Sequence, residues 1–126
     1  MNQNLKIQSF TNLIAWQKSH KLVLTIYKII KTFPAVETYS LVDQMRRCVI
    51  SITSNIAEGF SRKSYKEKVQ FYSIALGSTT ELQNQLLVAR DVGYLPKDQF
   101  IEIAVSTVEV HKLINGLIKG SKKYVK

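Results

Sequence analysis

The chain has few of the residues that support a fold covalently or through a metal ion. Among its 126 residues it has one cysteine, Cys48, and two histidines, His20 and His111. A single cysteine excludes an internal disulfide, and we expect Cys48 to act as a small buried hydrophobic side chain in a reducing, cytoplasmic setting. Neither histidine has a partner at a metal-ligand spacing, so we expect no metal and no cofactor.

The sequence also lacks the spacings that catalysis requires. It has no glycine-rich phosphate loop, and Ser51 and Ser54 have no base nearby that would activate them as nucleophiles. We therefore predict that the protein is not an enzyme, and we assign no catalytic residue.

Acidic residues are scarce, and both ends of the chain lack them. Eighteen Lys and Arg stand against nine Asp and Glu, which gives a formal net charge of +9. Residues 1–36 and 110–126 contain lysines but no acid, and residues 62–68 contain four cations and one glutamate. Such a field favours polyanions, above all nucleic acid. The alternative is that the lysines serve only solubility.

Long apolar runs and alternating strand patterns are absent. No stretch approaches the ~20 apolar residues of a membrane-spanning helix, and the first residues do not resemble a signal peptide. Apolar residues instead recur at steps of three and four, the period of an amphipathic helix. Pro34, Gly93 and Pro96 interrupt this pattern. We predict four helices, at about residues 11–33, 38–58, 65–92 and 96–118.

Capping residues mark the expected starts of two helices. Thr11 or Asn12 is placed to cap the first helix, since their side chains accept hydrogen bonds from exposed backbone amides. Ser64 and Glu67 have the spacing of a capping box at the start of the third.

Three glycines carry further predictions. Gly59 is expected to end the second helix in a left-handed conformation, and Gly120 is expected to end the fourth. Gly77 lies in mid-helix, where glycine costs about 1 kcal/mol of helix propensity, so we expect a close helix approach there.

The connections between the predicted helices are short, which favours antiparallel neighbours. The fold class is therefore all-α, an up-down-up-down antiparallel four-helix bundle over residues 11–120. Residues 1–10 form an N-terminal extension, and residues 121–126 form a basic C-terminal tail that we expect to be loose.

The second predicted helix has a polar stripe beside its apolar one. Amides, hydroxyls and single charges along it can form directional hydrogen bonds, which suits a subunit interface or a ligand, although a solvated face is equally consistent. Arg47 and Glu58 lie about three turns apart, too far to pair within one helix, so we predict that they pair across a subunit boundary. The stripe comprises Gln44, Arg47, Ser51, Asn55 and Glu58.

Residues 44–59 resemble the signature of four-helix-bundle proteins encoded in intervening sequences of bacterial 23S ribosomal RNA genes. Thr53 departs from it, because the family commonly has a proline there. The resemblance implies a homopentameric barrel around a channel. It also implies a distant likeness to accessory variability determinant proteins of diversity-generating retroelements, which bind nucleic acid and a reverse transcriptase. Matching residues flank the signature at 13–18, 33–34, 37–41, 61–64, 74–81 and 93–95.

These features predict a non-enzymatic, oligomeric nucleic-acid-binding protein, with RNA as the ligand. The alternative is an oligomeric scaffold for a protein partner such as a reverse transcriptase. Tyr65, beside the basic segment, is a candidate for stacking on an unpaired base. The cations expected to contact phosphates are Arg46, Arg47, Arg62, Lys63, Lys66, Lys68, Lys122 and Lys123.

Overall fold

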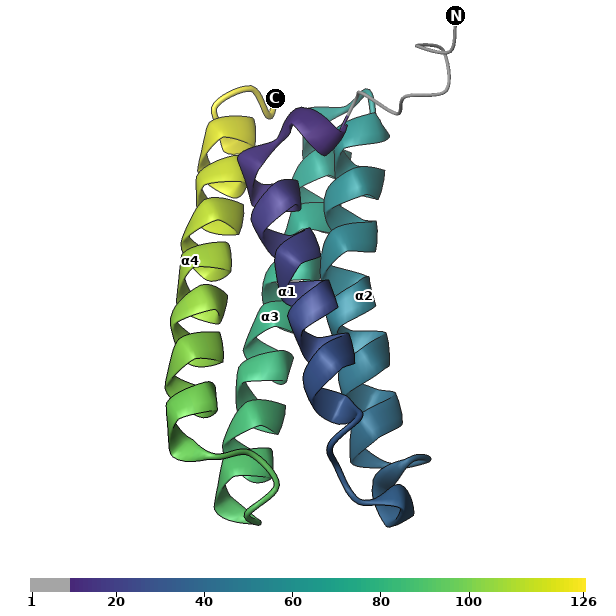
Figure 1. The fold of residues 1–126 in the computed structure, drawn as a ribbon. Helices are drawn as coiled ribbons and strands as arrows, with labels where there is room; N and C mark the ends of the chain where they lie inside the picture. Colours follow the sequence, from purple (N-terminus) through teal and green to yellow (C-terminus); the bar gives the residue numbers. More distant parts are fainter. Residues whose placement is uncertain (1–9) are drawn as a thin grey trace, which may run out of the picture.

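Four long helices make up residues 10–126, the part of the chain that the computed structural model describes (Figure 1). Apart from Phe10, the predicted N-terminal extension lies outside the described residues. Two short 3-10 helices, η2 and η3, precede α1 and α2. The bounds are η2 Phe10–Asn12, α1 Ile14–Ile30, η3 Ala35–Glu37, α2 Leu41–Ser61, α3 Tyr65–Asp91 and α4 Lys97–Lys122.

Consecutive helices run antiparallel, and α1 contacts both α2 and α4 (Figure 1). This arrangement confirms the predicted all-α, up-down-up-down bundle. The α2–α3 connection and the C-terminus lie at one end of the bundle, and the α1–α2 and α3–α4 connections lie at the other. Within the described residues, no helix is long and apolar enough to cross a membrane.

The core lies between the apolar faces of all four helices. Several buried hydroxyls donate to a carbonyl of their own helix, as Ser19 does to Ala15 at 2.7 Å and Thr79 to Ala75 at 2.9 Å, so these groups enter the core without losing a hydrogen bond. The apolar stripe of α2 is buried along its whole length, at Val42, Met45, Val49, Ile52 and Ile56. The largest fully buried side chains include Leu22, Ile26, Met45, Ile52, Ile56, Leu82, Leu86 and Ile114.

The first helix is shorter than predicted at both ends. Its N-cap is Leu13 rather than Thr11 or Asn12, and Leu13 makes no side-chain capping bond. At the other end, α1 stops at Ile30, and the chain turns so that Phe33 is buried, with its ring centroid 5.5 Å from that of Tyr94. Pro34 disfavours a helical conformation at Phe33, and burial of the Phe33 ring stabilises the turn that follows α1.

Gly59 does not end α2, so that prediction is wrong. The helix continues to Ser61, and Gly59 is buried against α3. A Cβ atom at position 59 would lie 2.7 Å from Cε1 of Tyr72, whereas one at Gly77 would meet nothing within 4 Å. The close helix approach predicted at Gly77 occurs instead at Gly59.

Gly120 does not end its helix either, because α4 continues to Lys122. Ser121 is buried, and its carbonyl accepts a hydrogen bond from the backbone N–H of Tyr124 at 3.1 Å. The tail expected to be loose is therefore held by a turn at its start. Gly93 behaves as predicted, since it follows α3 with a φ of 89°.

Glu37 links the two connections at the end of the bundle away from the C-terminus. Its carboxylate accepts hydrogen bonds from Ser40 Oγ at 2.6 Å, from the Tyr94 hydroxyl at 2.8 Å and from the Leu41 backbone N–H at 3.4 Å. The bond from Ser40, followed by that from Tyr94, holds the pKa of Glu37 below its usual value of 4.5. The ionised carboxylate therefore ties the α3–α4 connection to the start of α2.

We expect Glu37→Gln to reduce the loss of stability that the protein shows in acid. The pKa of Glu37 is lower in the folded than in the unfolded protein. Its carboxylate therefore stabilises the fold fully above about pH 4.5, the unfolded pKa, and this stabilisation is lost as the pH falls through the folded pKa. Urea unfolding of both proteins across this range measures the difference. Parallel curves of unfolding free energy against pH would contradict the prediction.

Candidate nucleic-acid interface

Most of the net positive charge lies at one end of the bundle. The α2–α3 connection lies at the same end of the bundle as the end of α4 (Figure 1). The ring centroids of Tyr65 and Tyr124 lie 5.0 Å apart there. We call residues 58–68 and 119–126 the basic end. It contains Glu58 and Glu67 as its acids, against eight cations: Arg62, Lys63, Lys66, Lys68, Lys119, Lys122, Lys123 and Lys126.

The opposite end of the bundle carries no such excess. Residues 31–47 and 90–102, which we call the neutral end, contain five cations and five acids. The charge is therefore distributed unequally along the bundle axis. The sequence showed separate basic segments, and the antiparallel topology brings two of them to one place.

Four of the predicted phosphate-binding residues are available for a ligand: Lys63, Lys66, Lys122 and Lys123. All four are exposed. Among residues 10–126, no hydrogen bond or ion pair is found for any of them. Their ammonium groups can approach phosphates without breaking a contact of the fold.

Arg62 has partners within the protein. Its guanidinium pairs with Glu58 (Nη2–Oε2, 3.1 Å) and Glu67 (Nη1–Oε1, 3.9 Å), and it lies 4.7 Å from the ring centroid of Phe71. Its Nε is buried without a hydrogen-bond partner in the structure. Arg62 therefore braces the α2–α3 connection, and its charge is largely compensated.

Lys68 and Ser64 cap the two helices that meet at this connection. Lys68 Nζ donates to the carbonyls of Phe60 at 2.7 Å and Gly59 at 3.3 Å, at the C-terminus of α2. Ser64 Oγ accepts from the backbone N–H of Glu67 at 3.2 Å, which is the first half of the predicted capping box. Cations at a helix C-terminus and hydroxyls at an N-terminus both satisfy exposed backbone groups.

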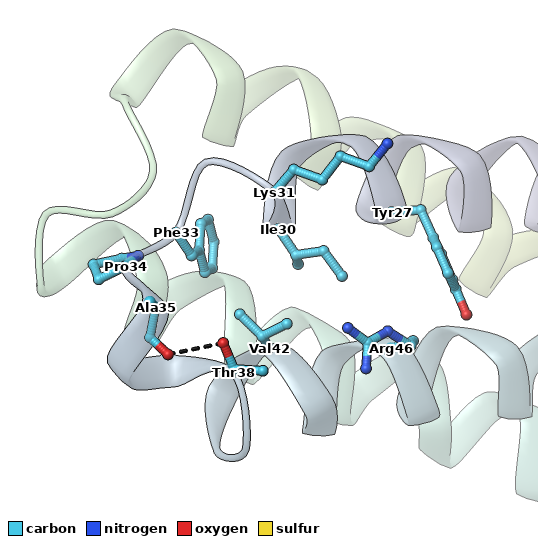
Figure 2. Close-up of a pocket in the computed structure, with 9 residues that line it drawn as sticks. All are labelled: Tyr27, Ile30, Lys31, Phe33, Pro34, Ala35, Thr38, Val42 and Arg46. Atoms are coloured by element: carbon cyan, nitrogen blue, oxygen red, sulfur yellow. Dashed lines mark hydrogen bonds between the residues drawn. The ribbon is translucent and has the colours of Figure 1, made fainter.

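Arg46 and Arg47 lie at the neutral end, apart from the other predicted cations. Both pair with Asp43, at 3.6 Å and 2.9 Å respectively. Arg46 lines a surface pocket of about 420 Å³, across from Tyr27 (Figure 2). The Cζ atom of Arg46 lies 6.0 Å from the centroid of the Tyr27 ring. The fold therefore brings six of the eight predicted cations together and separates these two.

The middle of the predicted polar stripe contacts α3 within one chain. Ser51 Oγ lies 2.9 Å from Ser78 Oγ, and Asn55 Nδ2 donates to Ser51 Oγ at 3.1 Å.

The thiol of Cys48 also contacts α3, and it donates to the Ser78 carbonyl at 3.0 Å. Burial, followed by the charge of Glu81, raises the pKa of Cys48 to about 12, so the thiol stays protonated and unreactive at neutral pH.

The charges of the stripe are exposed, and each has a partner one turn away on α2 or at its end. Arg47 pairs with Asp43 at 2.9 Å, and Glu58 pairs with Arg62 at 3.1 Å. Gln44 is exposed beside Arg47. A contact between Arg47 of one subunit and Glu58 of another stays a prediction. To form it, Arg47 must leave Asp43 or bind both carboxylates, and Glu58 must leave Arg62 or bind both guanidinium groups.

Sequence reasoning missed Tyr124 as a candidate functional residue, because it lay in the segment taken as a loose tail. The available signal was an aromatic residue directly after Lys122 and Lys123, as Tyr65 stands between Lys63 and Lys66.

In the described part of the chain, no three His, Cys, Asp or Glu side chains are grouped so that they could hold a metal ion.

Comparison with known proteins agrees with this architecture. The chain matches the family model of the 23S rRNA-intervening sequence protein over residues 11–116. A similar solved structure is that of a protein of unknown function from the S23 ribosomal protein family of Bacteroides thetaiotaomicron. The two share 23% identity with a TM-score of 0.78, over 84% of this chain and 96% of that one, a likeness that shows the fold. No curated protein matches the chain. Since the family match spans the bundle, the chain belongs to the 23S rRNA-intervening sequence protein family.

Proposed function

We propose that this protein is a non-enzymatic, oligomeric nucleic-acid-binding protein whose ligand is RNA. The observation that carries the proposal is the basic end, where eight cations face two glutamates. Six of the eight are exposed lysines for which no hydrogen bond or ion pair is found among residues 10–126. Phosphate contacts of this kind give affinity with little base specificity. The family name, which refers to an intervening sequence in 23S rRNA, favours RNA over DNA.

We further propose that copies of the chain assemble into a homopentameric barrel, as the sequence resemblance implies. The polar stripe on α2 supplies directional groups for the contact between subunits. If all subunits point the same way around the axis, five basic ends meet at one mouth of the channel. Their fields then add, which strengthens the attraction of a polyanion to that mouth.

Light-scattering mass after size exclusion, with and without a structured RNA fragment at low and moderate salt, tests both proposals. We expect a pentamer that takes up RNA at low salt and releases it as salt rises. The logarithm of affinity should fall against the logarithm of salt with a slope of about −0.7 per phosphate contact for single strands and −0.9 for duplexes. A flat salt response would argue against RNA binding, and a monomeric mass would argue against the barrel.

An apolar groove between α3 and α4 favours a second candidate function, an oligomeric scaffold for a protein partner such as a reverse transcriptase. Two residues that line the groove, Leu87 on α3 and Val108 on α4, are 41% and 47% exposed. Exposed apolar patches commonly mark protein-interaction sites. An oligomer that ignores RNA but forms a stable complex with a purified reverse transcriptase would support this function. The groove has a volume of about 270 Å³ and is lined by Gln83, Leu86, Leu87, Phe100, Ala104, Thr107 and Val108.

A further inference from the structure

Two tyrosines form an exposed aromatic pair at the basic end. Tyr65 is the first residue of α3, and Tyr124 follows the end of α4. Their ring centroids lie 5.0 Å apart with 34° between the ring planes, and the residues are 41% and 62% exposed. The pair therefore leaves substantial aromatic surface facing solvent, unlike Tyr72, which is 3% exposed in the core.

The four available lysines flank this pair in the sequence. Lys63 and Lys66 lie within two residues of Tyr65, and Lys122 and Lys123 directly precede Tyr124. The turn that joins Tyr124 to Ser121 holds its backbone close to the end of α4. Aromatic rings set among cations are the combination by which proteins bind single-stranded nucleic acid, because bases stack on the rings while phosphates contact the charges.

We propose that the basic end binds single-stranded nucleic acid, with an unpaired base stacked on the Tyr65–Tyr124 pair and neighbouring phosphates bound by the lysines. This inference rests on the proposed function and makes it more specific. Bases in a duplex are already stacked on one another, so they cannot use the rings, whereas the bases of loops, bulges and ends can. The site therefore selects unpaired segments, and within an RNA it prefers a loop or an end to a stem.

Substitution of the rings tests the proposal in the full-length protein. Tyr65→Leu/Tyr124→Leu removes both aromatic faces and keeps every charge. Tyr39→Leu is the control, because Tyr39 is 94% exposed and lies in the neutral end. The probes are a fluorescein-labelled 12-nucleotide oligouridylate, the matching oligothymidylate, and an RNA duplex of equal length. We expect the double variant to lose about tenfold to a hundredfold in affinity for both single strands and to bind the duplex within twofold of the wild type.

Two further measurements keep the test independent of folding defects. Tyr65→Phe/Tyr124→Phe keeps both rings and should bind as the wild type does. In the wild type, an oligonucleotide containing 2-aminopurine should lose fluorescence on binding, because stacking quenches that base. Unchanged single-strand binding by the leucine variant, or binding without quenching, overturns the proposal.

The outcomes also separate this inference from the proposed function. If the wild type binds no nucleic acid, the proposed function fails and this inference fails with it. If it binds and the leucine variant loses single strand and duplex equally, only the stacking site is wrong. Binding to vesicles of anionic phospholipid without quenching of 2-aminopurine would assign the tyrosines and lysines to a membrane surface and overturn the inference.

Discussion

Gly59→Leu is expected to lower the free energy of unfolding by about 2 kcal/mol, although leucine is the better helix former. A Cβ atom at this position would lie 2.7 Å and 2.9 Å from Cε1 and Cδ1 of Tyr72, and 3.1 Å from Cβ of Phe71. Tyr72 is 3% exposed, so its ring cannot move aside without disturbing the core. Overpacking of this kind typically costs about 1–3 kcal/mol, more than the ~1 kcal/mol that helix propensity returns.

Gly77→Leu is the matched control, since Gly77 lies mid-helix and a Cβ atom there meets nothing within 4 Å. The same substitution should raise stability by up to about 1 kcal/mol at this position. Urea unfolding at one fixed protein concentration compares the two, because self-association makes stability depend on concentration. Equal effects of the same sign at both glycines would refute the close approach of α2 and α3.

The second large effect is expected on nucleic-acid binding. Four of the exposed lysines of the basic end are predicted phosphate contacts, and replacing these four with glutamine should weaken RNA binding by about 10²–10³-fold at 0.1 M salt. The salt slope should become shallower by about 3, from four contacts at about 0.7 each. The fold should persist, because these side chains are exposed and no contact is found for them among residues 10–126. The variant is Lys63→Gln/Lys66→Gln/Lys122→Gln/Lys123→Gln.

A second quadruple variant separates the local charge from the total charge. Four exposed lysines outside the basic end can be replaced by glutamine, with the same fall in formal net charge from +9 to +5. We expect this variant to lose less than tenfold in affinity. Equal losses of affinity in both variants would show that RNA binding depends on the net charge of the whole protein and not on the charge of the basic end. The control is Lys21→Gln/Lys28→Gln/Lys31→Gln/Lys97→Gln.

Local sequence signals predicted the two ends of α3 closely. The end of α2 was predicted wrongly, because it depends on a tertiary contact with α3. Ser64 and Gly93 act through the backbone beside them, so the sequence alone locates both ends of α3. Gly59 is a different case, because a glycine that ends a helix and one that admits a facing ring look alike in sequence. Only the position of Tyr72 on the neighbouring helix distinguishes them.

The same error affected the candidate site. Because α2 is expected to stop at Gly59, the four-residue spacing of Glu58 and Arg62 does not suggest a pair on one helix, and Arg62 is predicted as a phosphate contact although it pairs with Glu58. The exposed lysines could be predicted from the sequence more easily, because a charged side chain that makes no contact within the fold stays available for a ligand. The pairing of residues 62–68 with residues 122–123 follows from the antiparallel order of helices.

Unequal charge at two ends of a long bundle gives the protein a large electric dipole. The ends are separated by about 40 Å, the length of the 27-residue α3. In the field of a distant polyanion such a molecule experiences a torque as well as an attraction, so it rotates before it makes contact. If the protein binds nucleic acid as proposed, encounters then begin with the basic end facing the polyanion, and added salt should slow association more than it speeds dissociation.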